Sequence, residues 1–98
     1  MFVTISTYRA KPGEEDAIVA LHEDWQLTRR ARNEGYLSGE LLRSLCDGQT
    51  FTDIARFENQ ELARAQANDP EQEAWYRRLV SLTESEPVVA DYQAEWWM

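Results

Sequence analysis

Two adjacent aromatic residues, Trp75 and Tyr76, are the side chains of this sequence best suited to hold an aromatic molecule. An indole ring can form a stacking wall, and a phenol hydroxyl can donate or accept a proton at the polar end of a ligand. The alternative is that Trp75 belongs to the hydrophobic core and Tyr76 is half-exposed. Trp25 leaves a similar choice open, because it lies on the apolar stripe of a predicted helix and could pack in the core or line the same pocket.

Two arginines, Arg43 and Arg56, fall on one face of a predicted sheet. Two guanidinium groups there could bind a phenolate or a carboxylate in a bidentate manner. They could also form ion pairs with Asp or Glu inside a subunit interface. Tyr8 and Tyr36 stand at strand ends, where the rim of a pocket often lies, although edge packing explains them as well. The candidate substrate-binding residues are therefore Trp75, Tyr76, Arg56, Arg43, Trp25 and Tyr8, and no catalytic residue is assigned.

The single histidine and the single cysteine, His22 and Cys46, do not form a recognisable reactive site. His22 could act as a general base near neutral pH, but it could also be an ordinary exposed residue of a helix. Cys46 is interpreted as a small apolar filler, since no histidine or strong base lies near it in sequence. One histidine and no cysteine cluster cannot form the usual metal sites, so we expect no metal and no cofactor.

Length and charge limit the partners of this chain. It has 98 residues and a formal net charge of -8, with 18 acidic against 10 basic side chains. One domain spanning residues 1–98 is expected at this length. The acidic balance argues against nucleic acid and anionic membrane surfaces, which both require a positive face. No apolar run approaches the roughly 20 residues of a membrane span. A lone cysteine without an internal disulfide, and no visible secretory leader, lead us to expect the cytoplasm.

The stretch from residue 36 to residue 57 predicts a β-hairpin around which the fold is organised. Asp47-Gly48 between two half-apolar runs is typical of a two-residue type I′ turn, in which both central residues have positive φ. Such a turn would pair Cys46 with Gln49 and fix the register of the strands. Both faces of this hairpin would then be partly apolar. We therefore expect helices to cover one face and a second partner to cover the other.

The elements around the hairpin complete a recognisable order. Asp69 is the expected N-cap of the last helix, and Gln72 is expected to complete a capping box there. The other predicted elements are a strand over 2–9, a helix from 14–16 to about 32, helices over 60–67 and from 70 to about 85, and a strand over 88–97. This order predicts an α+β fold of the ferredoxin-like βαββαβ type with a four-stranded antiparallel sheet. A second copy on the uncovered sheet face would give a two-fold homodimer.

Four groups of residues carry a resemblance to one family. They are Lys11-Pro12-Gly13, then Gly35-Tyr36 leading to Leu41-Leu42-Arg43-Ser44, then Ala55-Arg56-Phe57-Glu58-Asn59, and finally Ala74-Trp75-Tyr76-Arg77-Arg78-Leu79. With these groups, which span nearly the whole chain, the sequence resembles the antibiotic biosynthesis monooxygenase (ABM) domain family. The resemblance implies a dimeric α/β barrel, in which two ferredoxin-like sheets close on each other, and a pocket between each sheet and its own helices.

The resemblance also implies a range of activities. Members include cofactor-independent monooxygenases of quinol-like aromatics, haem-degrading enzymes and proteins of no assigned activity, so the fold alone does not fix the function. Where the haem-degrading members carry an Asn, a Trp and a His ligand, the corresponding neighbourhoods here hold Ser6, Gln66 and Trp75-Tyr76, so the haem ligand is missing. We therefore expect a cofactor-independent monooxygenase of a small aromatic or quinol-like substrate. The alternative is a dimeric protein that binds a small apolar or aromatic ligand without chemistry.

Overall fold

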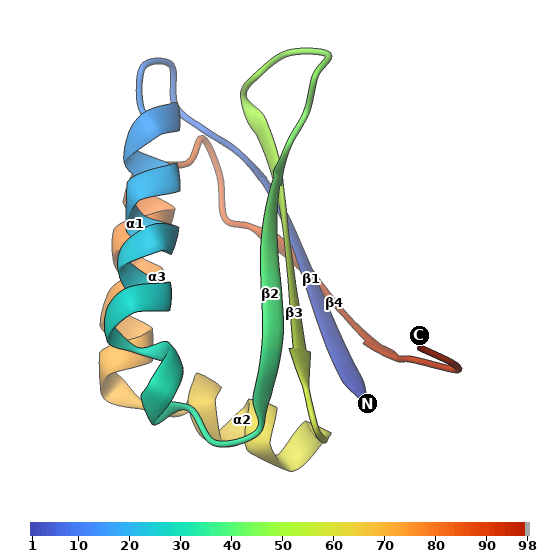
Figure 1. Ribbon diagram of the computed structural model, residues 1–98. Helices are drawn as coiled ribbons and strands as arrows, with labels where there is room; N and C mark the ends of the chain where they lie inside the picture. The colour runs from blue at the N-terminus through green and yellow to red at the C-terminus, as the bar shows by residue number, and fades with distance from the viewer. Residues whose placement is uncertain (98) are drawn as a thin grey trace.

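A computed structural model describes residues 1–97 and shows one antiparallel sheet with its helices on one side (Figure 1). The strands are β1 (Phe2–Arg9), β2 (Tyr36–Arg43), β3 (Thr50–Phe57) and β4 (Val88–Gln93), and the helices are α1 (Glu15–Thr28), the short 3₁₀ turn η1 (Arg30–Arg32), α2 (Gln60–Ala67) and α3 (Pro70–Ser81). The strands lie in the order β2-β3-β1-β4. The predicted ferredoxin-like α+β fold is confirmed, with β1 and β3 as its central strands.

Side-chain caps explain where the later helices begin. The Asn59 side chain accepts a hydrogen bond from the Leu62 N–H at the start of α2, and Asp69 accepts one from the Glu71 N–H at the start of α3. The predicted capping box was wrong, because the Gln72 carbonyl instead accepts the indole N–H of Trp25 at 2.7 Å. A bond between α1 and α3 has thus replaced a bond within α3.

The boundaries of three elements differ from those predicted. Helix α1 ends at Thr28 and gives way to η1, and α3 ends at Ser81 rather than near residue 85. A short bridge between Ala10 and Thr83 lies directly after α3 and ties this segment to the end of β1. Strand β4 ends at Gln93, which pairs with Phe2, the first residue of the antiparallel strand β1, so residues 94–97 extend past the strand.

The turn predicted between β2 and β3 was also wrong. Residues 44–49 form a longer loop, and among residues 1–97 only glycines have positive φ, so Gly48 adopts it and Asp47 does not. Asp47 instead uses its carboxylate as a cap: Oδ1 accepts the N–H groups of Gln49 and Thr50 at 2.8 and 2.9 Å. These bonds lower the pKa of Asp47 to about 2. The Asp47 side chain therefore closes a six-residue loop in place of the predicted two-residue turn.

The longer loop changes the register by one residue and so changes the faces of the sheet. Arg43 pairs with Phe51, and Ser38 pairs with Arg56, with an irregularity between Tyr36 and Ser38. The prediction that Arg43 and Arg56 share a face was therefore wrong. Arg43 lies on the helix-covered face together with Phe51, whereas Arg56 lies on the opposite face, which we call the open face.

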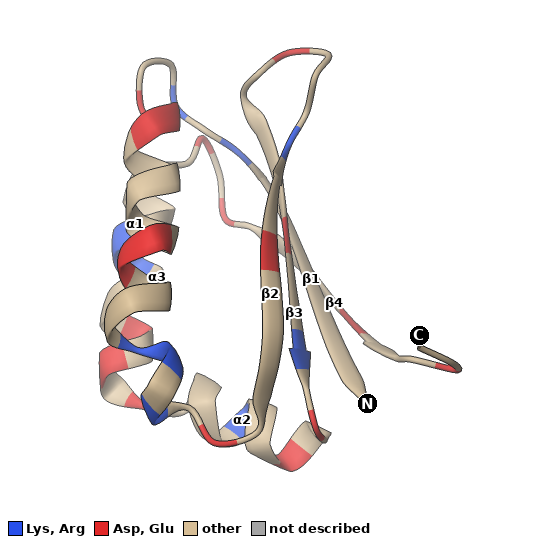
Figure 2. Ribbon diagram, viewed as in Figure 1, with Lys and Arg blue, Asp and Glu red and all other residues tan. Residues whose placement is uncertain are grey.

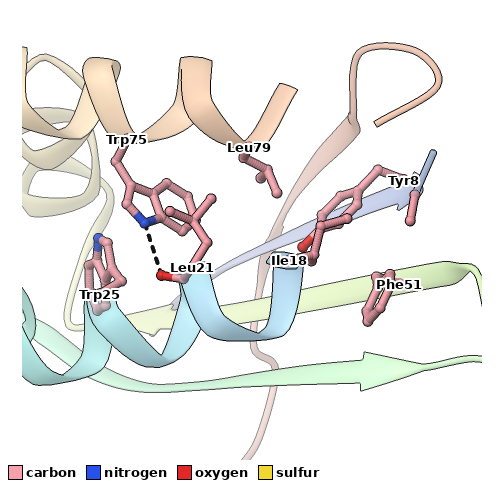
Figure 3. Packing of buried hydrophobic residues seen from close by; sticks show 8 residues of the cluster. Tyr8, Ile18, Leu21, Trp25, Phe51, Trp75 and Leu79 are labelled. Atoms are coloured by element: carbon pink, nitrogen blue, oxygen red, sulfur yellow. Dashed lines mark hydrogen bonds between the residues drawn. The ribbon is translucent and has the colours of Figure 1, made fainter. Parts of the chain in front are cut away.

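The core fills the space between the helices and the covered face of the sheet. Tyr8 of β1 and Phe51 of β3 lie together at one end of this core, and Trp75 points from α3 to Leu21 and Trp25 at the other end (Figure 3). The fully buried side chains include Phe51, Phe57, Ile18 and Leu79. Burial of such side chains contributes about 2 kcal/mol each.

Charged residues are interspersed over the elements rather than gathered by sign. Figure 2 shows Lys and Arg on several elements, each with acidic residues nearby. The mostly buried Arg29 donates to Glu71 Oε2 at 2.7 Å and to Asp69 Oδ2 at 3.3 Å, so it ties the end of α1 to the start of α3. None of the helices described has both the length and the apolar character that a membrane crossing requires.

Candidate functional site

An internal cavity of about 140 Å³ lies between the covered face of the sheet and the helices. We call it the inner cavity. Strands β1 and β3 form its floor, and α1, α2 and α3 form its walls. Its lining is Thr4, Ser6, His22, Trp25, Gln26, Tyr36, Asp53, Ala55, Phe57, Gln66, Gln72, Trp75, Tyr76, Leu79 and Pro87. Aromatic rings and polar side chains line it together, so it offers both flat apolar surfaces and hydrogen-bonding groups to a small molecule.

Three of the predicted substrate-binding residues, Trp25, Trp75 and Tyr76, line this cavity. Both tryptophans are also core residues, only 6% and 7% exposed, so each belongs to the core and lines the cavity at the same time. Their N–H groups are fixed: Trp75 donates to the Leu21 carbonyl at 3.2 Å, and Trp25 donates to Gln72. Tyr76 is half-buried, and burial, with the nearby charge of Glu86, raises the pKa of its hydroxyl.

Tyr8 is buried beside the cavity and contacts His22, the only histidine in the sequence. Its hydroxyl lies 2.6 Å from His22 Nε2, and the two rings are nearly parallel. The edge of His22 also meets Trp75, with ring centroids 5.0 Å apart. The expectation that His22 is an exposed helix residue was wrong, because its side chain is only 14% exposed. Three contacts therefore fix the imidazole against the wall of the inner cavity.

Asp53 stands across from His22 and is the residue that the sequence analysis missed. Its Oδ2 lies 3.9 Å from His22 Nδ1, and its side chain is 27% exposed. The register places Asp53 opposite Ser6 of β1 and Leu41 of β2 on the covered face. An aspartate on a strand between Thr52 and Ile54 was a usable signal, but the incorrect turn obscured which side chains it would meet.

Burial controls the protonation of this group. It lowers the pKa of His22 to about 4 and raises the pKa of Asp53 to about 6. Burial, reinforced by the charge of Asp53, raises the pKa of Tyr8 far above its usual value. At neutral pH Tyr8 thus stays protonated, and its hydroxyl donates a hydrogen bond to Nε2 of a neutral His22. The ring N–H then lies on Nδ1, where it faces the Asp53 carboxylate.

A second hollow of about 300 Å³, the outer groove, lies between α1 and the edge strand β2. His22, Gln26 and Asp53 line both hollows and so form the boundary between them. Beside that boundary the Gln26 side chain donates to the Tyr36 hydroxyl at 2.9 Å. The Tyr36 hydroxyl lies against Gly39, where any Cβ would collide with it. Glycine at this position thus makes room for the α1–β2 contact.

The remaining candidates, Arg43 and Arg56, lie outside the inner cavity. Arg43 lines the outer groove, where its guanidinium lies over the Phe51 ring and donates to the Gly48 carbonyl at 2.6 Å. Arg56 pairs with Glu40 at 3.1 Å on the open face and lies over the Trp97 ring. Within one chain, the two arginines therefore cannot bind one ligand group together.

The donor set does not fit haem or a multidentate metal site. Ser6, Gln66, Trp75 and Tyr76, the positions that the family resemblance singled out, all line the inner cavity. The one imidazole there already engages Nε2 with the Tyr8 hydroxyl. Within residues 1–97, no group of three or more His, Cys, Asp or Glu side chains is placed to hold a metal ion.

Comparison with known families agrees with this architecture. The sequence profile described as antibiotic biosynthesis monooxygenase matches residues 1–87. The chain belongs to this family. No curated protein sequence matches the chain.

Solved structures share the fold at low identity. A Nitrosomonas europaea protein named for the ABM family superposes with a TM-score of 0.83 at 17% identity, over 98% of this chain and 100% of that one. A Deinococcus radiodurans protein named for the same family gives 0.83 and 17%, over 100% and 96%. A conserved protein from Methanosarcina mazei Go1 gives 0.85 and 11%, over 96% and 92%. At these identities the structural matches show the fold alone, and this ABM chain's substrate must be argued from its own cavity.

Proposed function

We propose that this ABM protein is a cofactor-independent monooxygenase of a small aromatic, quinol-like substrate. The observation that carries the proposal is the inner cavity, where the rings of Trp25 and Trp75 lie beside a neutral histidine and a carboxylate. Aromatic walls suit a flat ring, and the polar groups of the lining, Asp53 and His22 among them, can recognise a hydroxyl.

The size of the cavity restricts the substrate. A cavity of about 150 Å³ is known to hold one benzene ring, and the inner cavity measures about 140 Å³. A single-ring phenol or quinol therefore fits as the structure stands. A larger substrate would place one ring in the inner cavity and extend through the boundary at Gln26 into the outer groove.

The proposed reaction needs only the substrate and molecular oxygen. A phenol or quinol that loses a hydroxyl proton becomes electron-rich at the ring carbons opposite and next to the oxygen, and one of these carbons that carries hydrogen reacts with O₂. One oxygen atom becomes the second carbonyl of a quinone, and the other leaves as water with the two hydrogen atoms that the substrate loses. The substrate supplies all four electrons. The protein's part is to bind, orient and deprotonate the ring in a site that excludes water.

Oxygen uptake with a panel of single-ring phenols and quinols tests this proposal. We expect consumption of one O₂ per quinone formed, and loss of that activity in Ala55→Leu, which fills the cavity floor. Ala65→Leu places the same side chain on the exposed surface of α2 and should retain full activity. If folded protein binds these compounds but leaves them unchanged in air, the chain is a ligand-binding protein and the oxygenase proposal is wrong.

The open face supports a second proposal, that the protein acts as a homodimer. Leu42, Val88 and Tyr92 lie on this face, and they are 46%, 73% and 53% exposed. Val3, Ile5 and Ile54 lie between them and are only half-buried. A sheet face this apolar is unusual on a monomer, and a second copy related by a two-fold axis would cover it. Sedimentation that gives a single species of one chain's mass, 11.4 kDa, would contradict the dimer.

A further inference from the structure

We propose that the Asp53 carboxylate accepts the hydroxyl hydrogen of the substrate phenol and then takes its proton. This inference rests on the proposed function, because it assigns a role within the same cavity. Asp53 lies in the middle of β3 and lines both the inner cavity and the outer groove. A phenol bound in the inner cavity or in the outer groove could therefore place its hydroxyl beside this carboxylate.

The carboxylate lacks a donor of its own. Within residues 1–97, the ring N–H on Nδ1 of the neutral His22 faces it at 3.9 Å, which is beyond hydrogen-bond distance. No other group described in residues 1–97 donates a hydrogen bond to it, although about three-quarters of its side-chain surface is covered. A half-buried carboxylate without donors is costly. A ligand hydroxyl would supply the missing donor.

Tyr8 and His22 act as positioning residues for this acceptor. The Tyr8 hydroxyl occupies Nε2 at 2.6 Å, so Nδ1 carries the ring hydrogen and faces Asp53. The imidazole therefore cannot accept the substrate proton at either nitrogen without breaking that arrangement. Burial also makes Asp53, with a pKa of about 6, a stronger base than His22, with a pKa of about 4. His22 instead presents its Nδ1–H to the carboxylate at 3.9 Å, too far to occupy the acceptor that a ligand hydroxyl would use.

The charges around Asp53 favour a neutral phenol over a phenolate. The titratable and charged side chains that line the two hollows around it are His22 and Glu23 of α1, Tyr36, Glu40 and Arg43 of β2, and Tyr76 of α3, and Tyr8 of β1 contacts His22 from outside the lining. Three of the lining side chains, counting Asp53 itself, are carboxylates, and Arg43 is the only cation among them; Glu40 is already paired with Arg56. The phenol would thus enter protonated. Its O–H bond then breaks toward Asp53, the electron pair stays on the substrate oxygen, and the proton returns to the oxygen atom that leaves as water.

4-Nitrophenol tests the assignment without any oxidation, because its phenolate is coloured and its phenol is not. The probe is titrated with wild-type protein near pH 7 under nitrogen. We expect binding to remove colour, with the apparent pKa of the bound probe raised by about one unit. Asp53→Asn should bind the probe without that rise, and Asp53→Glu should restore it. Asp91→Asn, the same change at an exposed carboxylate of β4, should behave as wild type.

Two results would overturn the assignment: failure of the wild type to bind the probe, or an equal pKa rise in wild type and in folded Asp53→Asn. Circular dichroism of each variant separates these results from misfolding, and Asp53→Ser, which also lacks the carboxylate, replaces the Asn variant if that variant does not fold. Oxygen uptake is measured in parallel. A colour change without oxygen uptake would contradict the oxygenase and retain the phenol site, whereas oxygen uptake that is unaffected by Asp53→Asn would contradict only the role of Asp53.

Discussion

The two faces of the sheet differ in how their side chains are packed. The covered face has Tyr8, Phe51 and Asp53 packed against α1 and α3, and each makes a defined contact there. The open face is also apolar, but Leu42, Val88 and Tyr92 meet no other part of the described chain closely enough to be buried. The covered face therefore determines the fold and the proposed chemistry of one chain, while the open face is available for association.

Removing a large side chain from each face should give the largest contrast. Phe51 is completely buried, and Phe51→Ala should lower the free energy of unfolding by about 3–5 kcal/mol, because it removes apolar contacts and leaves a cavity. Leu42→Ala should cost under about 1 kcal/mol in the monomer, since the side chain is already half-exposed. Urea unfolding of dilute protein measures both. Equal losses would mean that the open face is packed within the chain.

The titrations of His22 and Asp53 should have opposite effects on the pH dependence of stability. Between pH 4 and 6 the folded protein holds one proton on Asp53, with a pKa of about 6, whereas the unfolded chain holds one on His22, with a usual pKa of 6.5. The numbers of bound protons are equal, so this pair should add little pH dependence in wild type.

Asp53→Asn removes that balance. The depressed pKa of His22 then makes the unfolded chain bind one proton more than the folded protein between pH 6.5 and 4. Relative to wild type, the variant should therefore lose about 2–3 kcal/mol of stability as the pH falls from 7 to 4. Denaturant unfolding at several pH values measures this loss. A variant with the same pH profile as wild type would show that His22 is not held neutral by burial.

A charge on the open face should affect association rather than folding. Leu42→Glu would place an unpaired carboxylate in the proposed dimer contact and should weaken dimerisation at least tenfold, which corresponds to about 1.4 kcal/mol. Leu27→Glu is the matched control, because Leu27 is 86% exposed on α1, outside the open face. Sedimentation equilibrium measures both variants. Equal effects would assign the association to another surface.

The smallest effect concerns a single hydroxyl. Tyr8→Phe removes the bond to His22 Nε2 and should lower stability by about 1 kcal/mol. Thr7→Val, at the preceding position and on the open face, removes a hydroxyl that bonds to no other side chain within residues 1–97, and should change stability by under about 0.5 kcal/mol. Thermal unfolding compares the two. If Tyr8→Phe leaves the stability unchanged, water replaces the hydroxyl without a cost in free energy.

The sequence predicted the element order well because alternation and helical spacing are local signals. Strand 2–9 and helix 60–67 have the bounds expected for them. The site was predicted less completely, since it depends on register. One residue in the β2–β3 loop decides whether Arg43 shares a face with Arg56 or with Phe51. His22 and Asp53 come together only when that register is known, because they are 31 positions apart and neither forms a motif alone.

The four tryptophans fall into a buried pair and an exposed pair, whose fluorescence can be told apart. Trp25 and Trp75 are fixed by hydrogen bonds at the inner cavity, whereas Trp96 and Trp97 are 78% and 56% exposed near the end of the chain. An aqueous quencher such as acrylamide should suppress emission from the exposed pair and leave that from the buried pair. The remaining fluorescence would then report directly on whether a ligand occupies the cavity, without any label added to the protein.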